Sequence, residues 1–543
     1  MTRHQRLAAA VGAVGAFGLG ATALAGAAAA PASAASPAAT VHWHQCPQYS
    51  DAAIEATGVP PEQVPAFRAL WARTECGTVS VPLDYRRPEG RRVDIAITRL
   101  KATDRAHRLG NLAVNPGGPG GSGYLVPINL VLRGNAALNE RYDLIGFDPR
   151  GIGYSTKVNC PPPAEEPPPP APGPLTEAVA KQLYDSRVKG NQACYRTDPA
   201  FLGQLTTANV ARDLNQVRQA LGERKISYFG ASWGTLLGAV YRSMFPATVA
   251  RMWLDSVVGP EANRLDVRSA DVAAATERGV ARQAAWIAAR DTTYGLGDTP
   301  ERVEAAILAM RRALDAEPVR FSDVEMPLDG SFIAFLASSP GPLWAEASEA
   351  LKEMRDARSG TPAPPAVKPI VSPPPDGGPP PADAPERANR TANQAMLCND
   401  DTSPHDFATF WADYQRILQR NPITGGLTQP TQGCAGWPKP KRPWNLHPGG
   451  GSLVLSGHRY EHVTPYPWTP LMRSTIGGTV FTVEDDIHGS VPFVPECASH
   501  LATYFDTGTP GSTGCQGVQP PDGATPAAAT SATANRLRYP RAA

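Results

Sequence analysis

The pentapeptide at 230–234, Gly-Ala-Ser-Trp-Gly, constrains this chain more than any other segment. It follows a short β-prone run at 225–229 and precedes an apolar stretch at 235–241 with helical character. A serine in such a turn between strand and helix is typical of a nucleophile elbow, where flanking glycines avoid steric clashes. The segment therefore predicts a tight turn that raises the Ser232 hydroxyl above a sheet edge. An ordinary Gly/Ser turn is the alternative.

Strand and helix patterns alternate on both sides of this turn. Strand-like apolar runs occur at 79–83, 93–97, 111–114, 142–147, 251–254, 452–455 and 479–483. Between two of them, residues 208–221 carry one apolar stripe at helical spacing. This alternation predicts a mainly parallel sheet that is covered by helices.

The sheet pattern is interrupted by a long helical insertion. Residues 41–258 are expected to form the first part of the core, and residues 446–515 its C-terminal part. The intervening segment 259–445 contains Ala/Arg/Glu-rich helical stretches and a Pro-rich segment, 360–385, that predicts a flexible loop. The Ala/Thr/Pro-rich tail at 516–543 is expected to be disordered.

The N-terminus has the pattern of a secretory leader. Arg3 and Arg6 precede an Ala/Gly-rich run at 7–30, and Ala-Ser-Ala at 32–34 offers a cleavage site. Residues 1–34 are therefore expected to be a signal peptide of a secreted protein without membrane association after cleavage. A membrane anchor is the alternative, although Ala and Gly favour insertion only weakly.

The eight cysteines agree with export. An even number in an exported chain favours disulfides, although eight cysteines allow about 105 pairings. Buried free thiols are the alternative. The simplest pairing joins neighbours in the sequence: Cys46 with Cys76, Cys160 with Cys194, Cys398 with Cys434, and Cys497 with Cys515.

Charge and motif content exclude other classes of function. The net charge is +1 and the basic residues are scattered, so no nucleic-acid partner is expected. No C-x-x-C pair of a zinc or redox site is present. The serine chemistry developed below implies neither a metal nor an organic cofactor.

A nucleophilic serine requires a base and an orienting acid, which follow it in the order acid, then histidine, in chains with this elbow. The candidate base is His488, just after the strand-like run at 479–483. The candidate acid is Glu461, the only carboxylate in the preceding loop, which would accept a hydrogen bond from Nδ1. Asp255, at the end of the strand after the elbow helix, is the alternative acid.

An oxyanion hole requires two backbone N–H groups. One is expected from Trp233, directly after the serine. The second is expected from the glycine-rich turn at 115–123, with Gly118 as the first choice and Gly117 as the alternative. A phosphate-binding loop is disfavoured because the turn lacks the P-loop lysine.

Three motifs in order carry a family resemblance: Asn-Pro-Gly-Gly-Pro-Gly-Gly-Ser-Gly at 115–123, Gly-Phe-Asp-Pro-Arg-Gly-Ile-Gly at 146–153, and the elbow. Together they resemble the prolyl-aminopeptidase group of α/β-hydrolases, and more closely the secreted tripeptidyl aminopeptidases. Further matches extend the resemblance over residues 41–515. It implies an α/β-hydrolase core with a mainly parallel sheet, a large helical cap, and a Ser-Asp-His triad. Glu461 stands where the family normally has aspartate.

The resemblance also implies removal of short peptides from free N-termini. Such an enzyme must bind the α-ammonium group, and a carboxylate does so through charge-assisted hydrogen bonds. Asp400, which matches a family Cys-x-Asp position, is the first candidate, and Glu261 is the second. We therefore expect a secreted serine exopeptidase that releases tripeptides. The alternatives are an esterase on the same scaffold and a secreted binding protein with a decayed site.

Overall fold

The computed structural model describes residues 39–162, 172–372, 379–428, 432–438, 444–523 and 537–538. The predicted signal peptide at 1–34 lies outside these residues, as does most of the predicted tail. Over the described ranges, no helix is both long enough and apolar enough to cross a membrane.

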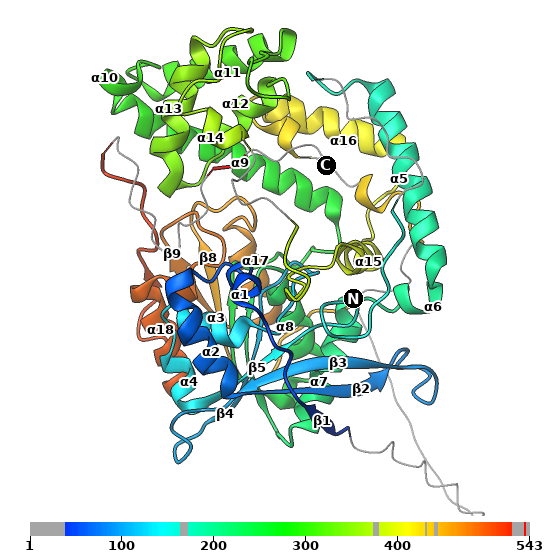
Figure 1. Ribbon diagram of the computed structural model, residues 1–543. Coiled ribbons are helices and arrows are strands. Elements are labelled where there is room, and N and C mark those ends of the chain that lie inside the picture. Colours follow the sequence, from blue (N-terminus) through cyan, green and yellow to red (C-terminus); the bar gives the residue numbers. More distant parts are fainter. Residues whose placement is uncertain are drawn as a thin grey trace, which may run out of the picture. The chain divides into compact units, whose positions relative to one another are not determined.

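A ten-stranded sheet forms the core, in the spatial order β1-β2-β3-β5-β4-β6-β7-β8-β9-β10 (Figure 1). Neighbouring strands from β5 to β10 in this order are parallel, and β1, β2 and β3 extend one edge in antiparallel pairing. The strands are β1 Val41–His44, β2 Thr74–Pro82, β3 Arg92–Leu100, β4 Gly110–Asn115, β5 Tyr142–Phe147, β6 Ile226–Ala231, β7 Val249–Asp255, β8 Ser452–His458, β9 Thr479–Val483 and β10 Gly514–Cys515. The predicted mainly parallel α/β architecture is confirmed.

Helices cover the sheet and build the layer above its carboxyl edge (Figure 1). Those before the insertion are α1 Asp51–Glu55, α2 Val64–Ala72, α3 Val126–Leu132, α4 Ala137–Arg141, α5 Glu177–Thr197, α6 Pro199–Leu202, α7 Thr207–Ala220 and α8 Trp233–Met244. The later ones are α9 Leu265–Ala288, α10 Asp291–Tyr294, α11 Pro300–Ala316, α12 Gly330–Ala337, α13 Trp344–Arg355, α14 Lys368–Val371, α15 Arg390–Asp400, α16 Phe407–Arg420, α17 Trp468–Ile476 and α18 Pro495–Thr507.

The two faces of the sheet bury alternate side chains. In β7, Met252 and Leu254 belong to an apolar cluster with α7 and α8. Trp253, between them in sequence, belongs to a second cluster with α18, where its ring lies 5.4 Å from that of Tyr504. Because successive side chains of a strand point to opposite faces, a central strand that is covered on both faces is apolar at every position.

The helical cap has an apolar core of its own, formed mainly by α9 to α14. The short helix α14 lies inside the segment predicted to be a flexible loop, 360–385. Its residue Ile370 and the preceding Val367 are buried in the cap core. That prediction is therefore wrong for the described residues 360–372, because the apolar side chains among the prolines find a buried surface.

Sequence order does not separate the two layers at the predicted boundaries of 258 and 446. Helix α5 precedes the elbow, yet it packs against the cap helix α16 (Figure 1). The Tyr184 hydroxyl donates to the His405 carbonyl over 2.5 Å, and its ring lies 5.5 Å from the Phe407 ring. Conversely, α15 belongs to the insertion, but Met396 on it is buried in the core cluster with α7 and α8.

The described start of the tail is ordered, contrary to the prediction of disorder from residue 516. The Val518 N–H donates to Asp485 Oδ2 over 2.9 Å. The Pro521 carbonyl accepts from the Trp286 indole over 3.0 Å. The segment contains few apolar residues, but its backbone groups find partners in the core and on α9.

Four disulfides join the cysteines that are neighbours in the sequence. The pairs are Cys46–Cys76, Cys160–Cys194, Cys398–Cys434 and Cys497–Cys515. Each closes a loop of a few tens of residues, which restricts the unfolded chain and stabilises the fold by roughly 3–4 kcal/mol.

A buried ion pair anchors the chain that follows β5. Arg150 Nε and Nη2 each donate to the Asp213 carboxylate of α7 over 2.7 Å. Both residues are fully buried, and the Arg150 guanidinium also donates to the Leu83 and Pro82 carbonyls at the end of β2. The arginine of the motif at 146–153 thus joins three elements of the core.

We predict that Arg150→Gln lowers the free energy of unfolding by about 3–5 kcal/mol, because Asp213 is then buried without its cation. Chemical denaturation followed by circular dichroism measures this change. The control is Arg302→Gln, which removes an exposed pair with Asp298 and should cost less than about 1 kcal/mol. Equal stability of the two variants would contradict the argument.

Candidate active site

The Gly-Ala-Ser-Trp-Gly turn adopts the strained geometry of an elbow. Ser232 lies between β6 and α8 with φ 56° and ψ −128°, a backbone conformation that L-residues rarely adopt. A Cβ atom on Gly230 would lie 2.4 Å from the Gly234 carbonyl oxygen, and one on Gly234 would lie 2.8 Å from the Asn115 carbonyl oxygen. Only glycine fits at either position, which explains the motif.

The glycine-rich turn after β4 lies directly against this serine. A Cβ on Gly117 would lie 2.8 Å from Ser232 Cβ and 3.1 Å from the Trp233 nitrogen. The Gly117 N–H already donates to Asn115 Oδ1 over 3.0 Å. The hydrogen bonds among described residues include none from the Gly118 N–H. This favours Gly118 over Gly117 as an oxyanion donor.

Trp233 offers the second donor. It is the first residue of α8, so no helical carbonyl lies four residues earlier to accept its N–H. Its indole Nε1 donates to Thr207 Oγ1 over 3.1 Å, which fixes the orientation of the side chain. Trp233 follows Ser232 directly, and Gly118 follows Gly117, the glycine that contacts it; their role as oxyanion donors stays a prediction.

A buried aspartate that sequence reasoning left without a role supports the glycine turn. Asp148 Oδ1 accepts from the Ser122 hydroxyl over 2.5 Å and from the Gly123 N–H over 3.1 Å. Its second oxygen accepts from the Tyr154 N–H over 2.9 Å. Burial raises the pKa of Asp148 to about 6, although these hydrogen bonds lower it. In the sequence, Asp148 could have been identified by its place in the motif at 146–153.

Glu461 and His488 are brought into contact. Glu461 Oε1 and His488 Nδ1 form a short hydrogen bond between a fully buried carboxylate and a ring that is 34% exposed. Glu461 Oε1 also accepts from the N–H and hydroxyl of Thr464 over 3.0 and 2.9 Å, and Oε2 accepts from Ser256 Oγ over 2.9 Å. The predicted acid and base are thus neighbours, and their contact leaves Nε2 of the ring free to face a substrate.

The surroundings keep the Glu461 carboxylate ionised. Burial alone would raise the pKa of Glu461, but the hydrogen bond from His488 and the charges of His488 and His458 outweigh it and lower that pKa. An ionised carboxylate here would stabilise an imidazolium at His488.

The elbow and the histidine loop lie close together. A Cβ on Gly489, the residue after His488, would lie 3.7 Å from Ala231 Cβ, next to Ser232. Among the hydrogen bonds of the described residues, none joins Ser232 Oγ to His488. Catalytic hydrogen bonds are often long without substrate and shorten in the Michaelis complex.

Asp255, the alternative acid, is engaged elsewhere. Its carboxylate accepts from Ser456 Oγ over 2.6 Å and contacts His458 Nε2 at 3.0 Å. His458 Nδ1 lies 2.6 Å from Asp485 Oδ1, so the imidazole is held between two carboxylates. All three side chains of this His458 cluster are fully buried. The geometry therefore favours Glu461 as the partner of His488.

The His458 cluster holds a positive charge inside the protein. Burial by itself lowers the pKa of His458, but the charges and hydrogen bonds of Asp255 and Asp485 raise it well above its ordinary value. The sequence gives His458 no recognisable role. Its partners come from the ends of other strands, so no local pattern marks it.

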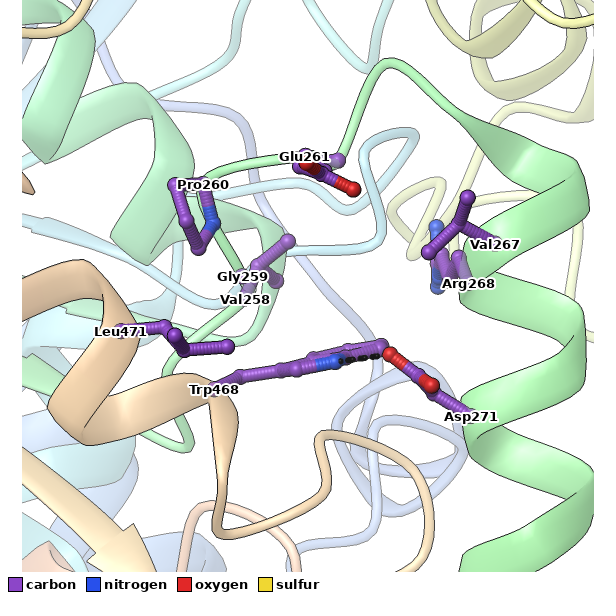
Figure 2. A pocket seen from close by; sticks show the side chains of 10 residues that line it. Val258, Gly259, Pro260, Glu261, Val267, Arg268, Asp271, Trp468 and Leu471 are labelled. Atoms are coloured by element: carbon purple, nitrogen blue, oxygen red, sulfur yellow. Dashed lines mark hydrogen bonds between the residues drawn. The ribbon is translucent and has the colours of Figure 1, made fainter.

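The two candidates for binding the α-ammonium group differ in access. Asp400 is buried, and its Oδ2 accepts from the N–H and hydroxyl of Thr207 at the start of α7 over 3.1 and 2.6 Å. Burial raises the pKa of Asp400 to about 7. Glu261 is exposed and lines a pocket (Figure 2). A substrate can therefore reach Glu261 more readily than Asp400.

Within the described ranges, no group of three or more His, Cys, Asp or Glu side chains is placed to hold a metal ion.

Comparison with known proteins supports the same fold and indicates a narrower class of enzyme. Residues 111–313 match the family model described as alpha/beta hydrolase fold. Tripeptidyl aminopeptidase of Streptomyces coelicolor is 32% identical over 473 residues, which are 84% of this chain and 85% of that protein.

Two mycobacterial relatives are similar as well. Serine protease Hip1 of Mycobacterium tuberculosis is 35% identical over 195 residues, 35% of this chain and 37% of that protein. Carboxylesterase B of the same species is 29% identical over 460 residues, 80% of this chain and 84% of that protein.

The charge on His458 predicts a pH dependence of stability. Because its pKa is raised in the folded state, its contribution is fully present below the unfolded pKa of about 6.5 and is lost as the pH rises above that value. The free energy of unfolding of the wild type relative to His458→Gln should therefore fall above about pH 6.5, by up to about 1.4 kcal/mol per pH unit. Urea denaturation between pH 5 and 9 measures the difference; a difference that is constant over this range would refute the prediction.

Proposed function

Because this chain belongs to the tripeptidyl aminopeptidase family of α/β-hydrolase serine peptidases, we propose that it releases tripeptides from the free N-termini of peptides outside the cell. It is a serine hydrolase of the aminopeptidase class. The observation that carries the proposal is the buried contact between Glu461 and His488, next to an elbow that presents Ser232. A serine, a histidine and a carboxylate in this arrangement perform acyl transfer.

In this proposal Ser232 Oγ attacks the carbonyl carbon of the scissile peptide bond while His488 Nε2 takes its proton. The N–H groups of Trp233 and Gly118 donate to the oxyanion of the tetrahedral intermediate. His488 then gives the proton to the leaving amine, and the C–N bond breaks to form an acyl-enzyme. Water, deprotonated by His488, attacks this ester and frees the tripeptide.

Glu461 orients the imidazole and stabilises the imidazolium that forms in each half-reaction. It has one methylene more than the aspartate usual in the family. Three hydrogen bonds, from Ser256 and Thr464, hold its carboxylate against His488. These bonds support the assignment because they position the longer side chain without solvent contact.

Recognition of the free N-terminus is assigned first to Glu261 and second to Asp400. Glu261 has an exposed carboxylate at the core-to-cap connection, where it can accept charge-assisted hydrogen bonds from an ammonium group. Asp400 Oδ1 lacks a hydrogen-bond partner among the described residues, but the side chain is buried, so a substrate could reach it only after a rearrangement.

Export is supported by the leader pattern at 1–34 and by the four disulfides, which persist in oxidising compartments. After cleavage of the leader we propose a secreted enzyme.

Ester hydrolysis is the second candidate function. It is favoured by the relative named carboxylesterase B, which is similar over 80% of this chain. The proposed catalytic groups serve either reaction, so only substrate selectivity separates them.

We predict that the purified enzyme releases tripeptides from a peptide library with free N-termini, and that N-acetylation of the same peptides abolishes release. Mass spectrometry of the products measures both. Ser232→Ala should lower turnover by about 10⁴-fold or more. Cleavage of short acyl esters without any release from free N-termini would refute the peptidase and support the esterase.

We further predict that Glu461→Gln lowers kcat by about 10³- to 10⁴-fold with little change in folding, since the amide cannot stabilise the imidazolium. Steady-state kinetics and a thermal melt measure the two effects. Asp255→Asn serves as the comparison, because Asp255 contacts His458 and not His488. A larger loss of kcat in Asp255→Asn than in Glu461→Gln, at equal stability, would reverse the assignment of the acid.

A further inference from the structure

A pocket of about 120 Å³ lies where the chain leaves the core for the cap (Figure 2). We name it the Arg268 pocket. Its walls come from residues 258–262, from Val267, Arg268 and Asp271 on α9, and from Trp468 and Leu471 on α17.

Hydrogen bonds tie one wall of the pocket to the proposed catalytic residues. The Val258 N–H donates to Thr235 Oγ1 over 2.9 Å, and this hydroxyl donates to the Ser232 carbonyl over 2.7 Å. Ser256, two residues before Val258, donates to Glu461. The pocket is therefore directly connected to the segments that carry the proposed nucleophile and acid.

A hydrogen bond and close packing hold the side of the pocket that Trp468 forms. Its indole Nε1 donates to Asp271 Oδ2 over 2.7 Å (Figure 2). On the facing segment, a Cβ on Gly259 would lie 2.9 Å from the Trp468 ring, so glycine permits close packing there. Together with Val258, Pro260 and Leu471, the indole supplies an apolar surface. The Asp271 carboxylate is engaged by this indole and forms no ion pair with Arg268.

Arg268 supplies a positive charge that the described part of the chain leaves without a partner. No hydrogen bond or ion pair of the described residues involves its guanidinium, whereas Arg264, one turn earlier, pairs with Asp266 at 2.6 Å. Glu261 lines the same pocket and forms no ion pair with Arg268 either. Burial lowers the pKa of Arg268, yet arginine stays charged at neutral pH. A half-buried cation without a counterion is costly, and a bound anion would offset that cost.

We propose that the Arg268 pocket binds a carboxylate of the peptide substrate. This inference rests on the proposed peptidase function and names a preferred class of substrate, peptides that carry an acidic group near the scissile bond. The guanidinium would bind the carboxylate through two parallel hydrogen bonds, and the apolar walls would contact the methylene stem. The pocket is large enough to hold several waters and so has room for such a group. The carboxylate comes either from a Glu or Asp side chain or from the C-terminus of a short peptide.

The test compares kcat/KM for matched peptides with free N-termini. One arm places Glu or Gln at each of the first three positions of otherwise neutral, C-terminally amidated peptides. The wild type should prefer Glu by about 10-fold or more at one position, the size of a charge-assisted hydrogen bond. In the second arm a neutral peptide ends in a free acid or an amide. Preference in the first arm assigns a side-chain carboxylate, and preference in the second assigns the terminal one.

Arg268→Gln should reduce the preferred acid-to-amide ratio to near 1, and Arg268→Lys should retain part of it. Arg264→Gln is the matched control on the same helix and should keep the wild-type ratio. Thermal melts ensure that only folded variants are compared. Because each result is a ratio within one enzyme, a general loss of activity does not imitate the effect.

Ratios near 1 for the wild type in both arms would overturn the proposal, as would equal ratios in the wild type and Arg268→Gln. The wild-type measurement decides even if both Arg268 variants fail to fold. Turnover of the neutral amidated peptide tests the peptidase function separately. If that peptide is cleaved while the ratios stay near 1, the proposed function stands and the pocket assignment fails.

Discussion

A buried imidazole held between two carboxylates is the interaction on which the arrangement of the site depends. Asp255 ends β7, His458 ends β8 and Asp485 follows β9, so the His458 cluster joins the ends of three neighbouring strands. The segments with Ser256, Glu461 and His488 each leave the sheet within three residues of a cluster member. Three buried charged groups would be costly alone. Direct contacts within the cluster and hydrogen bonds from Ser456, Ser490 and Val518 compensate them.

This cluster also explains how a glutamate is accommodated as the proposed acid. The longer side chain places its carboxylate between Ser256 and Thr464, whose hydroxyl groups donate to opposite oxygens. Ser256 has φ 56°, a strained conformation that turns the chain toward Glu461 immediately after Asp255. The Ser256 hydroxyl also accepts from the Gly489 N–H over 2.8 Å, next to His488. One serine therefore links the acid to the histidine loop.

The cap, which forms one wall of the Arg268 pocket, also contacts the loop that carries His488. Asp486, two residues before His488, accepts from the Gly341 N–H over 2.9 Å and lies 3.3 Å from the Arg282 guanidinium of α9. Burial raises the pKa of Asp486 to about 6. Arg282 in turn lies over the ring of Tyr460, beside Glu461. The helix that carries Arg268 thus contacts the loops of both Glu461 and His488. The position of the cap therefore affects the positions of these two residues.

Local sequence determined the elements of this protein. Short apolar runs, an apolar stripe at helical spacing, the elbow glycines and the order of the motifs were enough to predict the parallel sheet, the helical insertion and the elbow at Ser232. Those features depend on backbone sterics and on burial within one element, which neighbouring residues encode. The order acid, then histidine, after such an elbow gave Glu461 and His488 as candidates, and the family resemblance agreed with these positions. Their contact was an expectation until the strand ends were brought together.

Tertiary structure alone decided which distant groups meet. From the sequence, Asp255 and Glu461 were both plausible partners of the catalytic histidine. The packing of three strand ends places Asp255 against His458 instead. The same holds for α5 in the cap and α15 against the core, since an amphipathic helix does not specify which layer buries its apolar face. The sequence does not mark Arg268 either, because the folded surroundings of a cation decide whether it has a counterion. Long-range contacts of this kind arise from the topology of the sheet, which no local pattern records.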